Sequence, residues 1–259
     1  MNPVTLSKAD VLTEHIEIPV PDGTVMGAYL ARPATPTSPA AGVVVAHELF
    51  GVTAHIRDVC ERLAGRGYVA LAPDFYHRLS PGAELAHDPA GRDRGFGLLA
   101  GLERRSALMD GAQPFSYLKN FGCERVGVVG LSLGGHLGYL AATEVPYAAV
   151  VAAYPGWLAG TEIGLSRPEP TLARTAGIRG RVLVLCGDAD HAISGAERDA
   201  IGTALAAAGV AHEVVTYPGT PHGFLCDRRD SYQPEAAADA WRRIDALLDA
   251  ELGAASLGG

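Results

Sequence analysis

The sequence contains little cysteine. Its four cysteines, at positions 60, 123, 186 and 226, are scattered through 259 residues and form no Cys-x-x-Cys pair. This density is too low for a disulfide scaffold and is typical of a protein from a reducing compartment. We therefore expect free thiols, and we expect Cys60 and Cys186 to act as small buried apolar residues.

Basic patches and long apolar runs are lacking as well. The formal net charge is −8 at pH 7, and the arginines are mixed among acidic residues. This arrangement excludes the basic stripe that nucleic-acid binding uses. No segment approaches the roughly 18 consecutive apolar residues of a membrane span, and the first residues lack the basic-then-apolar order of a signal peptide. We expect a soluble, cytoplasmic protein that binds neither nucleic acid nor a membrane.

The composition is that of a globular chain. Apolar residues make up 48% and charged residues 19%, and no internal repeat is visible. A chain of 259 residues can bury a large core in one α/β domain. We therefore predict a single domain over residues 1–259 with flexible ends, and a monomer or homodimer in solution.

The first β-type runs flank a turn. Residues 16–20 and 24–31 are separated by Pro21-Asp22-Gly23, which predicts an antiparallel hairpin. A Pro-rich stretch at 33–39 is predicted to be a surface loop.

Beyond Gly42, short β-type runs alternate with helical patterns. This alternation is typical of a mostly parallel, doubly wound sheet with helices on both faces. Two Gly- and Pro-rich stretches, 76–100 and 156–179, are predicted to be loops over a pocket, without a large cap domain. The predicted strands are 43–46, 68–72, 126–129, 148–152, 182–185 and 213–217. The predicted helices are 54–66, 104–120, 133–143, 195–208 and 234–251.

The strongest local signal surrounds Ser132. The β-type run 126–129 leads into Gly130-Leu131-Ser132-Leu133-Gly134, and a helical pattern follows. A Gly-x-Ser-x-Gly turn between a strand and a helix holds the serine hydroxyl above the sheet edge, because only glycines leave room for the crowded backbones. The helix N-terminus brings the amide of Leu133 to the same place, where it can stabilise an oxyanion.

Two other interpretations of this segment fit less well. A chance Gly-x-Ser-x-Gly is common in a chain with 32 glycines, but the flanking strand and helix make coincidence a poor explanation. A dinucleotide fingerprint read from Gly130 would place Ser132 where the close approach of pyrophosphate needs a second glycine. We therefore interpret Ser132 as a nucleophile.

A serine nucleophile needs a base and an acid that orients the base. On this fold they follow in the order Ser, Asp, His, each just after a strand. His222 lies in a loop of turn-forming residues after the run 213–217 and is the expected base. Asp188 and Asp190 both follow the run 182–185. Asp190 lies deeper in the loop and is our choice, although the residues alone leave Asp188 open.

Further motifs give the sequence a family resemblance. The sequence resembles the dienelactone hydrolase family in several motifs. These are His47-Glu48-Leu49-Phe50-Gly51-Val52, residues 55–59 and 70–76, the Ser132 turn, Asp190 and Pro221-His222-Gly223-Phe224. The resemblance extends from about residue 14 to 250. It implies an α/β-hydrolase fold for nearly the whole chain.

The resemblance also implies roles for residues near the nucleophile. In that family the glutamate of the first motif, here Glu48, contacts the resting nucleophile, and the next amide, here Leu49, completes the oxyanion hole with Leu133. From the residues alone, Glu48 would be a strand-end carboxylate in a salt bridge. An ionised carboxylate opposes the charge of an oxyanion. We therefore expect Glu48 to hydrogen-bond the resting Ser132 hydroxyl, or a water, and to swing aside when substrate arrives.

The nucleophile itself departs from the well-known members of that family, which have a cysteine at this position. Ser132 is a far weaker acid than a thiol, so His222 must deprotonate it during attack. A role for Glu48 in activating a thiol therefore does not carry over. His47-Glu48 is not a zinc motif either, because the position of the second histidine in His-Glu-x-x-His is Gly51.

The arginines depart from the family pattern too. The well-known members bind a substrate carboxylate with two arginines, one of them shortly after the catalytic histidine. Residues 225–226 occupy that place here, and only Arg92 or Arg94 could match the other arginine. Arg228 and Arg229 are expected to be solvated loop charges. A broad esterase or lactonase is therefore a better expectation than an enzyme specific for dienelactone.

These observations predict acyl transfer from a carboxylic ester or lactone to water. Ser132 attacks the carbonyl, His222 takes and returns the proton, and Asp190 orients the imidazole. No metal or organic cofactor is implied. The rival functions are a thioesterase or acyltransferase with the same triad, and a ligand-binding homologue without turnover. The candidate substrate contacts are Tyr76, Arg94, Tyr154, Trp157 and Phe224.

Overall fold

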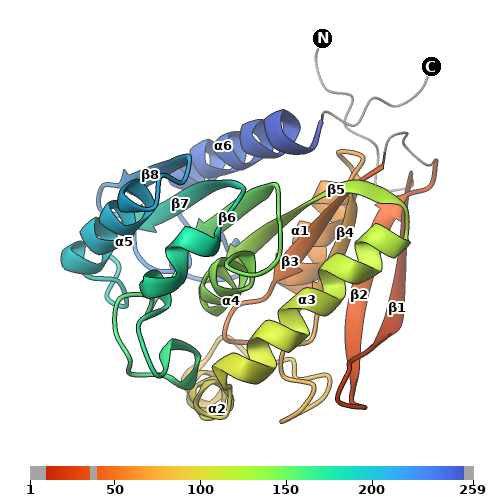
Figure 1. Cartoon of the computed structure of the whole chain (residues 1–259), viewed down its shortest axis with the longest axis horizontal. Coiled ribbons are helices and arrows are strands. Elements are labelled where there is room, and N and C mark those ends of the chain that lie inside the picture. The colour runs from red at the N-terminus through yellow and green to blue at the C-terminus, as the bar shows by residue number, and fades with distance from the viewer. Residues whose placement is uncertain (1–9, 36–39, 254–259) are drawn as a thin grey trace.

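A computed structural model describes residues 10–35 and 40–253 of the chain (Figure 1). These residues form one sheet of eight strands in the spatial order β1-β2-β4-β3-β5-β6-β7-β8. The expectations for the chain ends and for residues 36–39 of the Pro-rich stretch lie outside the described residues. The sheet has the predicted architecture, a mostly parallel array with an antiparallel N-terminal edge.

The first two strands form the predicted hairpin. β1 (Val11–Pro19) pairs antiparallel with β2 (Val25–Pro33), and β2 pairs antiparallel with β4. All other pairings between the described strands are parallel. The carboxyl ends of the parallel strands therefore meet at one edge of the sheet. These strands are β3 (Ala40–Ala46), β4 (Val69–Pro73), β5 (Cys123–Leu131), β6 (Ala149–Ala153), β7 (Arg181–Gly187) and β8 (His212–Tyr217).

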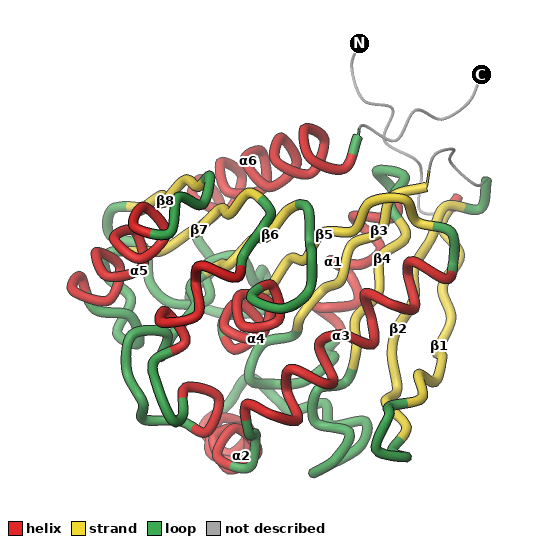
Figure 2. The backbone as a smooth tube through the Cα atoms, viewed as in Figure 1, coloured by secondary structure: helices red, strands yellow, loops and turns green. Residues whose placement is uncertain are grey.

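Helices cover both faces of the sheet (Figures 1 and 2). α1 (Ala54–Ala64) and α6 (Pro234–Leu252) share one face, where the Arg62 guanidinium lies 4.3 Å from the centre of the Trp241 ring. The opposite face is covered by α3 (Arg104–Asn120), α4 (Leu133–Ala142) and α5 (Gly195–Ala207). All five helices were predicted to within a few residues from their helical patterns.

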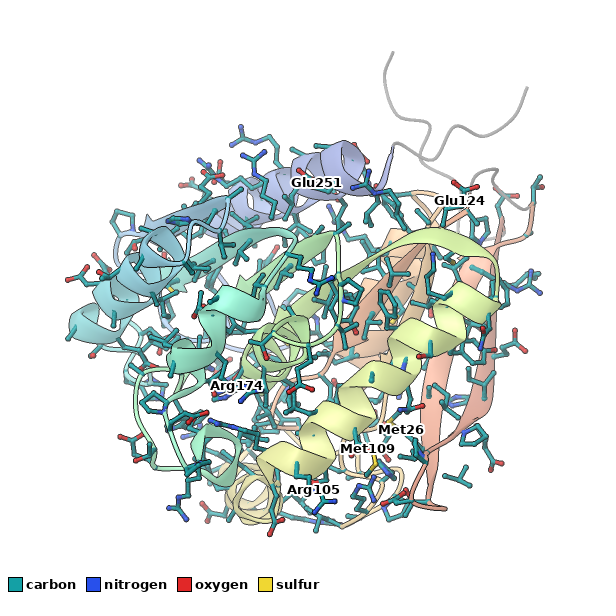
Figure 3. All side chains as sticks on the ribbon, viewed as in Figure 1. Met26, Arg105, Met109, Glu124, Arg174 and Glu251 are labelled. Atoms are coloured by element: carbon teal, nitrogen blue, oxygen red, sulfur yellow. The ribbon has the colours of Figure 1, made fainter. Side chains whose placement is uncertain are left out.

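The interior of the sheet is apolar. β6 is buried along its whole length, and β5 and β7 are exposed only near their starts, as expected for parallel strands covered on both faces. Side chains fill the space between the helices and the sheet, with charged groups such as Arg105 and Glu124 on the outside (Figure 3). All four cysteines are free and buried, and burial was predicted for Cys60 and Cys186. No helix in the described part of the chain combines the length and apolar character needed to cross a bilayer.

One helix contradicts the sequence analysis. α2 (Pro89–Ala100) lies inside the stretch 76–100 that was predicted to be a loop. Its start has the usual signals, since Asp88 accepts a hydrogen bond from the Gly91 amide at 2.7 Å and proline occupies the first helical position. The prediction was wrong because three glycines interrupt the helix and only Gly95 and Leu99 are buried, so no apolar stripe is visible.

The glycine at position 95 explains how α2 reaches the sheet edge. A Cβ atom there would lie 2.7 Å from Cγ of Leu49 and 2.9 Å from its carbonyl oxygen. Glycine therefore allows α2 to pack directly on Leu49. The second long stretch, 156–179, is mostly loop and contains two short 3-10 turns, Gly164–Ser166 and Thr171–Gly177.

Candidate active site

Ser132 occupies the sharp turn between β5 and α4. Its backbone has φ 56° and ψ −117°, a conformation that is unusual for a residue other than glycine. Positions 130 and 134 require glycine, because a Cβ atom at either position would clash with neighbouring backbone. A Cβ at position 130 would lie 2.0 Å from the carbonyl oxygen of Gly134, and one at position 134 would lie 2.0 Å from that of Ala46. The predicted strand, turn and helix are therefore present, and they hold the serine at the carboxyl edge of the sheet.

A chain of hydrogen bonds joins Ser132 to the loops after β8 and β7. The Ser132 hydroxyl lies 2.8 Å from Nε2 of His222, and Nδ1 of His222 lies 2.8 Å from Oδ2 of Asp190. A carboxylate can only accept, so Nδ1 carries the proton and Nε2 accepts from the serine hydroxyl. This is the tautomer in which the imidazole can remove the serine proton.

The geometry also distinguishes the two aspartates. The side chain of Asp190 is fully buried, and its second oxygen accepts from the Ala192 amide at 2.8 Å. Asp188 is exposed and accepts from the amide of Gly219 at 2.5 Å, which ties together the loops after β7 and β8. The structure thus brings Asp190, and not Asp188, to the imidazole.

The two peptides that flank the Leu49 Cα atom are fixed by side chains. His47 is fully buried, and its Nδ1 donates to the Glu48 carbonyl at 2.7 Å while its Nε2 accepts from the Phe75 amide at 3.2 Å. Burial lowers the pKa of His47, which keeps the ring neutral and able to serve as both donor and acceptor. The Tyr76 hydroxyl donates to the Leu49 carbonyl at 2.9 Å. These bonds restrict the direction of the Leu49 amide.

The Leu49 and Leu133 side chains belong to one buried apolar cluster, and the Leu133 amide lies at the N-terminus of α4. The two amides expected from the resemblance are therefore on neighbouring segments. Sequence reasoning missed the positioning role of His47. It also placed Tyr76 among the substrate contacts, and this is corrected by the structure, because Tyr76 is fully buried and its hydroxyl is used by Leu49.

Glu48 does not touch the resting Ser132 hydroxyl, which is bonded to His222. Its Oε1 instead lies 3.5 Å from Nη1 of Arg229 and 3.4 Å from the Tyr154 hydroxyl. The expected bond to the Ser132 hydroxyl is therefore corrected, whereas a bond to water and the movement on substrate binding stay predictions. A neutral serine hydroxyl donates to imidazole, and the buried carboxylate takes the guanidinium as counter-charge.

Arg229 is a second correction, because the sequence analysis expected a solvated loop charge. Its side chain is only 16% exposed, and the guanidinium lies 5.4 Å from the centre of the Phe50 ring. Arg228 does behave as expected and pairs with Asp58 at the surface. No local pattern separates the two arginines, since the difference arises from the tertiary contact with Glu48.

Two more candidate substrate contacts belong to the packing behind His222. Tyr154 and Phe224 are fully buried, and their ring centres lie 5.4 Å apart. The Tyr154 ring also meets the edge of the His222 ring at 5.1 Å, and burial raises the pKa of its hydroxyl well above the usual range. The expected role of both aromatic residues as substrate contacts is therefore corrected, because they pack behind the imidazole of His222.

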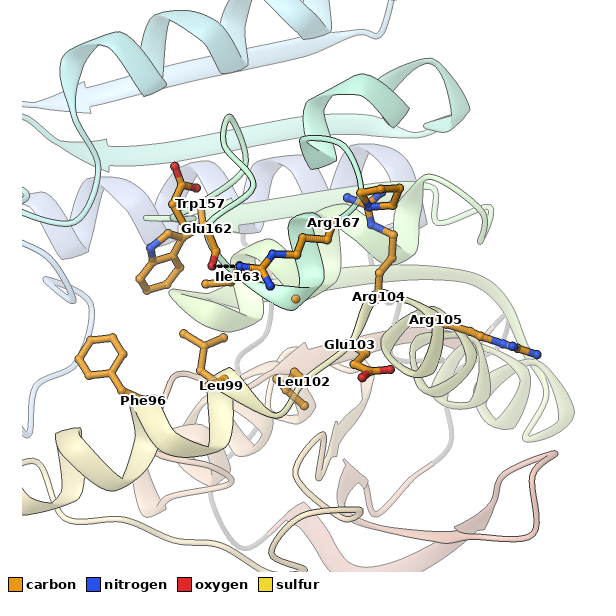
Figure 4. Close-up of a pocket in the computed structure, with 13 residues that line it drawn as sticks. Phe96, Leu99, Leu102, Glu103, Arg104, Arg105, Trp157, Glu162, Ile163 and Arg167 are labelled. Carbon is orange, nitrogen blue, oxygen red and sulfur yellow. Dashed lines mark hydrogen bonds between the residues drawn. The ribbon is translucent and has the colours of Figure 1, made fainter.

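Trp157 lines a pocket, but the residues that line this pocket include no member of the triad, so the contact of Trp157 with substrate stays a prediction. This pocket has a volume of about 720 Å³, and its apolar end is formed by Trp157, Phe96 and Leu99 (Figure 4). The residues come from both long stretches that were predicted to cover a pocket. Arg94 is a further correction, because it is exposed, donates to the Ser80 hydroxyl at 3.2 Å and is not among the lining residues. The charged lining residues are Glu103, Arg104, Arg105, Glu162 and Arg167.

One group of described residues has the composition of a metal site. Glu48, His87 and Cys226 each place a ligand atom within 4.8 Å of the others. None of them belongs to the chain of hydrogen bonds from Ser132 to Asp190.

Comparison with known proteins places the chain in a family. The family model described as "Dienelactone hydrolase family" matches residues 26–252. A Synechocystis protein named "Putative carboxymethylenebutenolidase" is 38% identical over 251 residues, which cover 94% of this chain and 98% of the relative. An Escherichia coli K12 protein of the same name is 33% identical, with coverage of 86% and 81%.

The solved structures agree with the sequence comparison. A crystal structure described as a "Putative Dienelactone Hydrolase" from Klebsiella pneumoniae superimposes with a TM-score of 0.82 at 32% identity, covering 92% of this chain and 98% of the other. A dienelactone hydrolase-like phosphotriesterase from metagenomic libraries has a TM-score of 0.78 at 21% identity and shows the same fold. The chain is a hydrolase with the α/β-hydrolase fold and belongs to the dienelactone hydrolase family.

Proposed function

We propose that the protein is a serine hydrolase that cleaves a carboxylic ester or lactone through an acyl-enzyme on Ser132. The observation that carries this proposal is the continuous chain of hydrogen bonds from Ser132 through His222 to Asp190, each of 2.8 Å. The turn conformation of Ser132 supports it, because that conformation presents the hydroxyl at the N-terminus of α4.

The proposed reaction has two halves. His222 accepts the hydroxyl proton as the Ser132 oxygen attacks the substrate carbonyl, and the amides of Leu49 and Leu133 stabilise the oxyanion. Collapse of the tetrahedral intermediate forms the ester with Ser132, and His222 gives its proton to the departing alkoxide. Water then attacks the acyl-enzyme with His222 again as base. In a lactone the new hydroxyl remains part of the acyl group, so the second step releases a single hydroxy acid.

The substrate we propose is a small ester or lactone, without a requirement for a carboxylate. The name carboxymethylenebutenolidase, which these relatives carry, denotes hydrolysis of a lactone that carries a carboxylate. In this chain Arg229 is engaged by Glu48 and Arg94 by Ser80. Arg229 therefore already faces a carboxylate of the protein itself, which favours a broader acyl specificity.

The finer features of this protein are also proposals. Four free, buried thiols fit a reducing cytoplasm, and we propose that a single-domain monomer or homodimer works there. Light scattering would measure the oligomeric state.

The function is tested with p-nitrophenyl esters of increasing chain length, simple lactones and an enol-lactone. We expect hydrolysis of at least one of these classes and, by intact-mass analysis, a single fluorophosphonate adduct on Ser132. An adduct on any other residue would contradict the assignment. Added alcohols and thiols separate hydrolysis from transfer, because an acyltransferase would form the new ester or thioester faster than the free acid. Absence of both turnover and labelling would favour a ligand-binding homologue.

A further inference from the structure

We propose that Glu48, His87 and Cys226 form a binding site for a thiophilic divalent metal ion, with Zn²⁺ as the representative, and that the bound ion lowers turnover. The site lies beside the proposed oxyanion hole, and of its three residues only Glu48 has a positioning role in the proposed reaction. The binding step is independent of the proposed function. Only the effect on turnover rests on it.

The three residues come from three separate segments. Glu48 follows β3, His87 precedes α2 and Cys226 lies in the loop after His222. Their ligand atoms lie within 4.8 Å of one another. Bond lengths of about 2.0 to 2.3 Å around tetrahedral zinc separate its ligand atoms by roughly 3.4 to 3.6 Å. The atoms therefore need to move closer by about an ångström, which side-chain rotation can supply.

Two of the three ligand groups have an unpartnered buried atom. Glu48 is 1% exposed, and its Oε2 has no hydrogen-bond partner in the described structure. Its Oε1 is the atom that faces Arg229 and Tyr154. Nε2 of His87 is likewise buried without a partner. Burial of a polar atom without a hydrogen-bond partner is unfavourable, and a metal ion bound through Oε2 of Glu48 and Nε2 of His87 would give both atoms a partner.

The donor set selects the type of ion. Thiolate and imidazole favour zinc and similar transition metals, whereas calcium and magnesium prefer oxygen ligands. Three protein ligands leave a fourth position for water. Burial lowers the pKa of His87, so its ring is neutral and available. Burial raises the pKa of Cys226 to about 12, so metal binding must release the thiol proton to solvent.

The charges balance when the ion is bound. The Cys226 thiolate and the Glu48 carboxylate together neutralise a divalent cation, while Arg229 keeps its contact with the other carboxylate oxygen. The nearby guanidinium repels the ion. We therefore expect reversible binding that is weaker than that of a structural zinc site.

A bound ion would act on both sides of Ser132. Glu48 is joined through the backbone to Leu49 and contacts the Tyr154 hydroxyl, and the Tyr154 ring supports His222. Cys226 lies four residues after His222 in the same loop. Closing the three ligands around a metal displaces both supports by part of an ångström, and displacements of about 1 Å can cost 100-fold in rate.

Binding is tested on the full chain after chelator treatment, with Co²⁺ as a spectroscopic probe and Zn²⁺ as its competitor. We expect one Co²⁺ per chain and a thiolate-to-cobalt charge-transfer band that Zn²⁺ removes. Cys226→Ala should abolish the band. His87→Ala should weaken binding by at least about 10- to 100-fold, the loss seen when even a group behind a metal ligand is removed. Cys60→Ala and His212→Ala are the matched controls and should bind as the wild type does.

The absence of a thiolate band in the wild type, or an unchanged band in Cys226→Ala, would overturn the site. If Cys226→Ala does not fold, His87→Ala decides, because His87 is only partly buried. In the activity assay Zn²⁺ should inhibit the wild type and both controls but neither ligand variant, and a chelator should reverse the inhibition. Equal inhibition of all five proteins would place the inhibitory ion elsewhere, for example on His222, and overturn the effect on turnover. Failure of the esterase proposal would leave the cobalt experiment unaffected.

Discussion

On one side of Ser132 the groups proposed to act in the reaction are side chains, whereas on the other side they are backbone amides that side chains hold in place. The first group, the triad side, consists of His222 and Asp190 in the loops after β8 and β7. The second, the oxyanion side, contains the Leu49 amide with His47 and Tyr76 behind it. On the triad side two consecutive hydrogen bonds join three side chains, whereas on the oxyanion side several side-chain hydrogen bonds hold neighbouring backbone groups.

This difference in construction has an energetic consequence. Each residue of the triad is needed, because removal of any one of the three disrupts proton transfer. On the oxyanion side the bonds restrict the two consecutive peptides that flank Leu49, so the loss of one bond is partly compensated by the others. Substitutions on the triad side should therefore be far more harmful to turnover than those on the oxyanion side.

The largest expected effect is that of Ser132→Ala. Loss of the nucleophile should lower kcat by roughly 10⁴ to 10⁶ and abolish fluorophosphonate labelling. Steady-state kinetics on the best ester of the panel measure the first effect, and intact mass measures the second. Ser116→Ala, an exposed serine on α3, is the control. Turnover at the wild-type rate in Ser132→Ala would show that Ser132 is not the nucleophile.

Asp190→Asn should follow, with a loss on the order of 10⁴ in kcat, as known for serine protease triads, because the amide favours the wrong imidazole tautomer. Asp188→Asn should cost far less, since that carboxylate is exposed and bonds to a loop amide. Parallel kcat measurements rank the two variants. The reverse ranking would assign the acid role to Asp188.

On the oxyanion side Glu48→Ala should lower kcat/KM by about 10- to 100-fold, because it removes a group that positions the site but not the base. It should also lower the melting temperature, because Arg229 loses its partner while only 16% exposed. Kinetics and thermal unfolding are measured together. The double variant Glu48→Gln/Arg229→Gln should recover melting temperature without recovering activity. Wild-type kinetics with a lower melting temperature would make Glu48 purely structural.

The smallest effect is expected for Tyr76→Phe, which deletes the hydrogen bond to the Leu49 carbonyl. One such bond contributes about 0.5 to 1.5 kcal/mol, so kcat should fall by roughly 2- to 13-fold while KM stays unchanged. Tyr68→Phe is the matched control, because its hydroxyl donates to Asp249 on α6 at 2.7 Å. A loss as large as that of Asp190→Asn would show that the oxyanion side has no redundancy.

The same comparison explains what the sequence could predict. Ser132 and His222 were selected because residue type and position after a strand are visible in the sequence. The same signals left Asp188 open beside Asp190, our choice, and the structure brings Asp190 to His222. The partners of Tyr76 and Arg229 were not predicted, because their roles depend on where the side chains point in three dimensions. Residue type alone suggested a pocket aromatic and a solvated charge.

The fold shows the same division. Strands and helices with strong apolar periodicity were located to within a few residues, since burial on the sheet determines their pattern. α2 was missed because its burial involves little more than Gly95 and Leu99. Its position depends on the close contact with Leu49, a contact that no local pattern reveals.

Strained backbone conformations at the carboxyl edge of the sheet lower thermal stability next to the proposed active site. Among the described residues other than glycine, Ser132, Tyr154 and Trp157 have positive φ angles, of 56°, 41° and 60°. Such conformations cost on the order of 1 to 3 kcal/mol each, which is a large part of a typical net stability of about 5 to 15 kcal/mol. Selection of variants for survival at high temperature alone would therefore favour glycine or asparagine at these positions. A directed-evolution experiment on this scaffold would have to screen for turnover in every round, or the most thermostable descendants would be inactive.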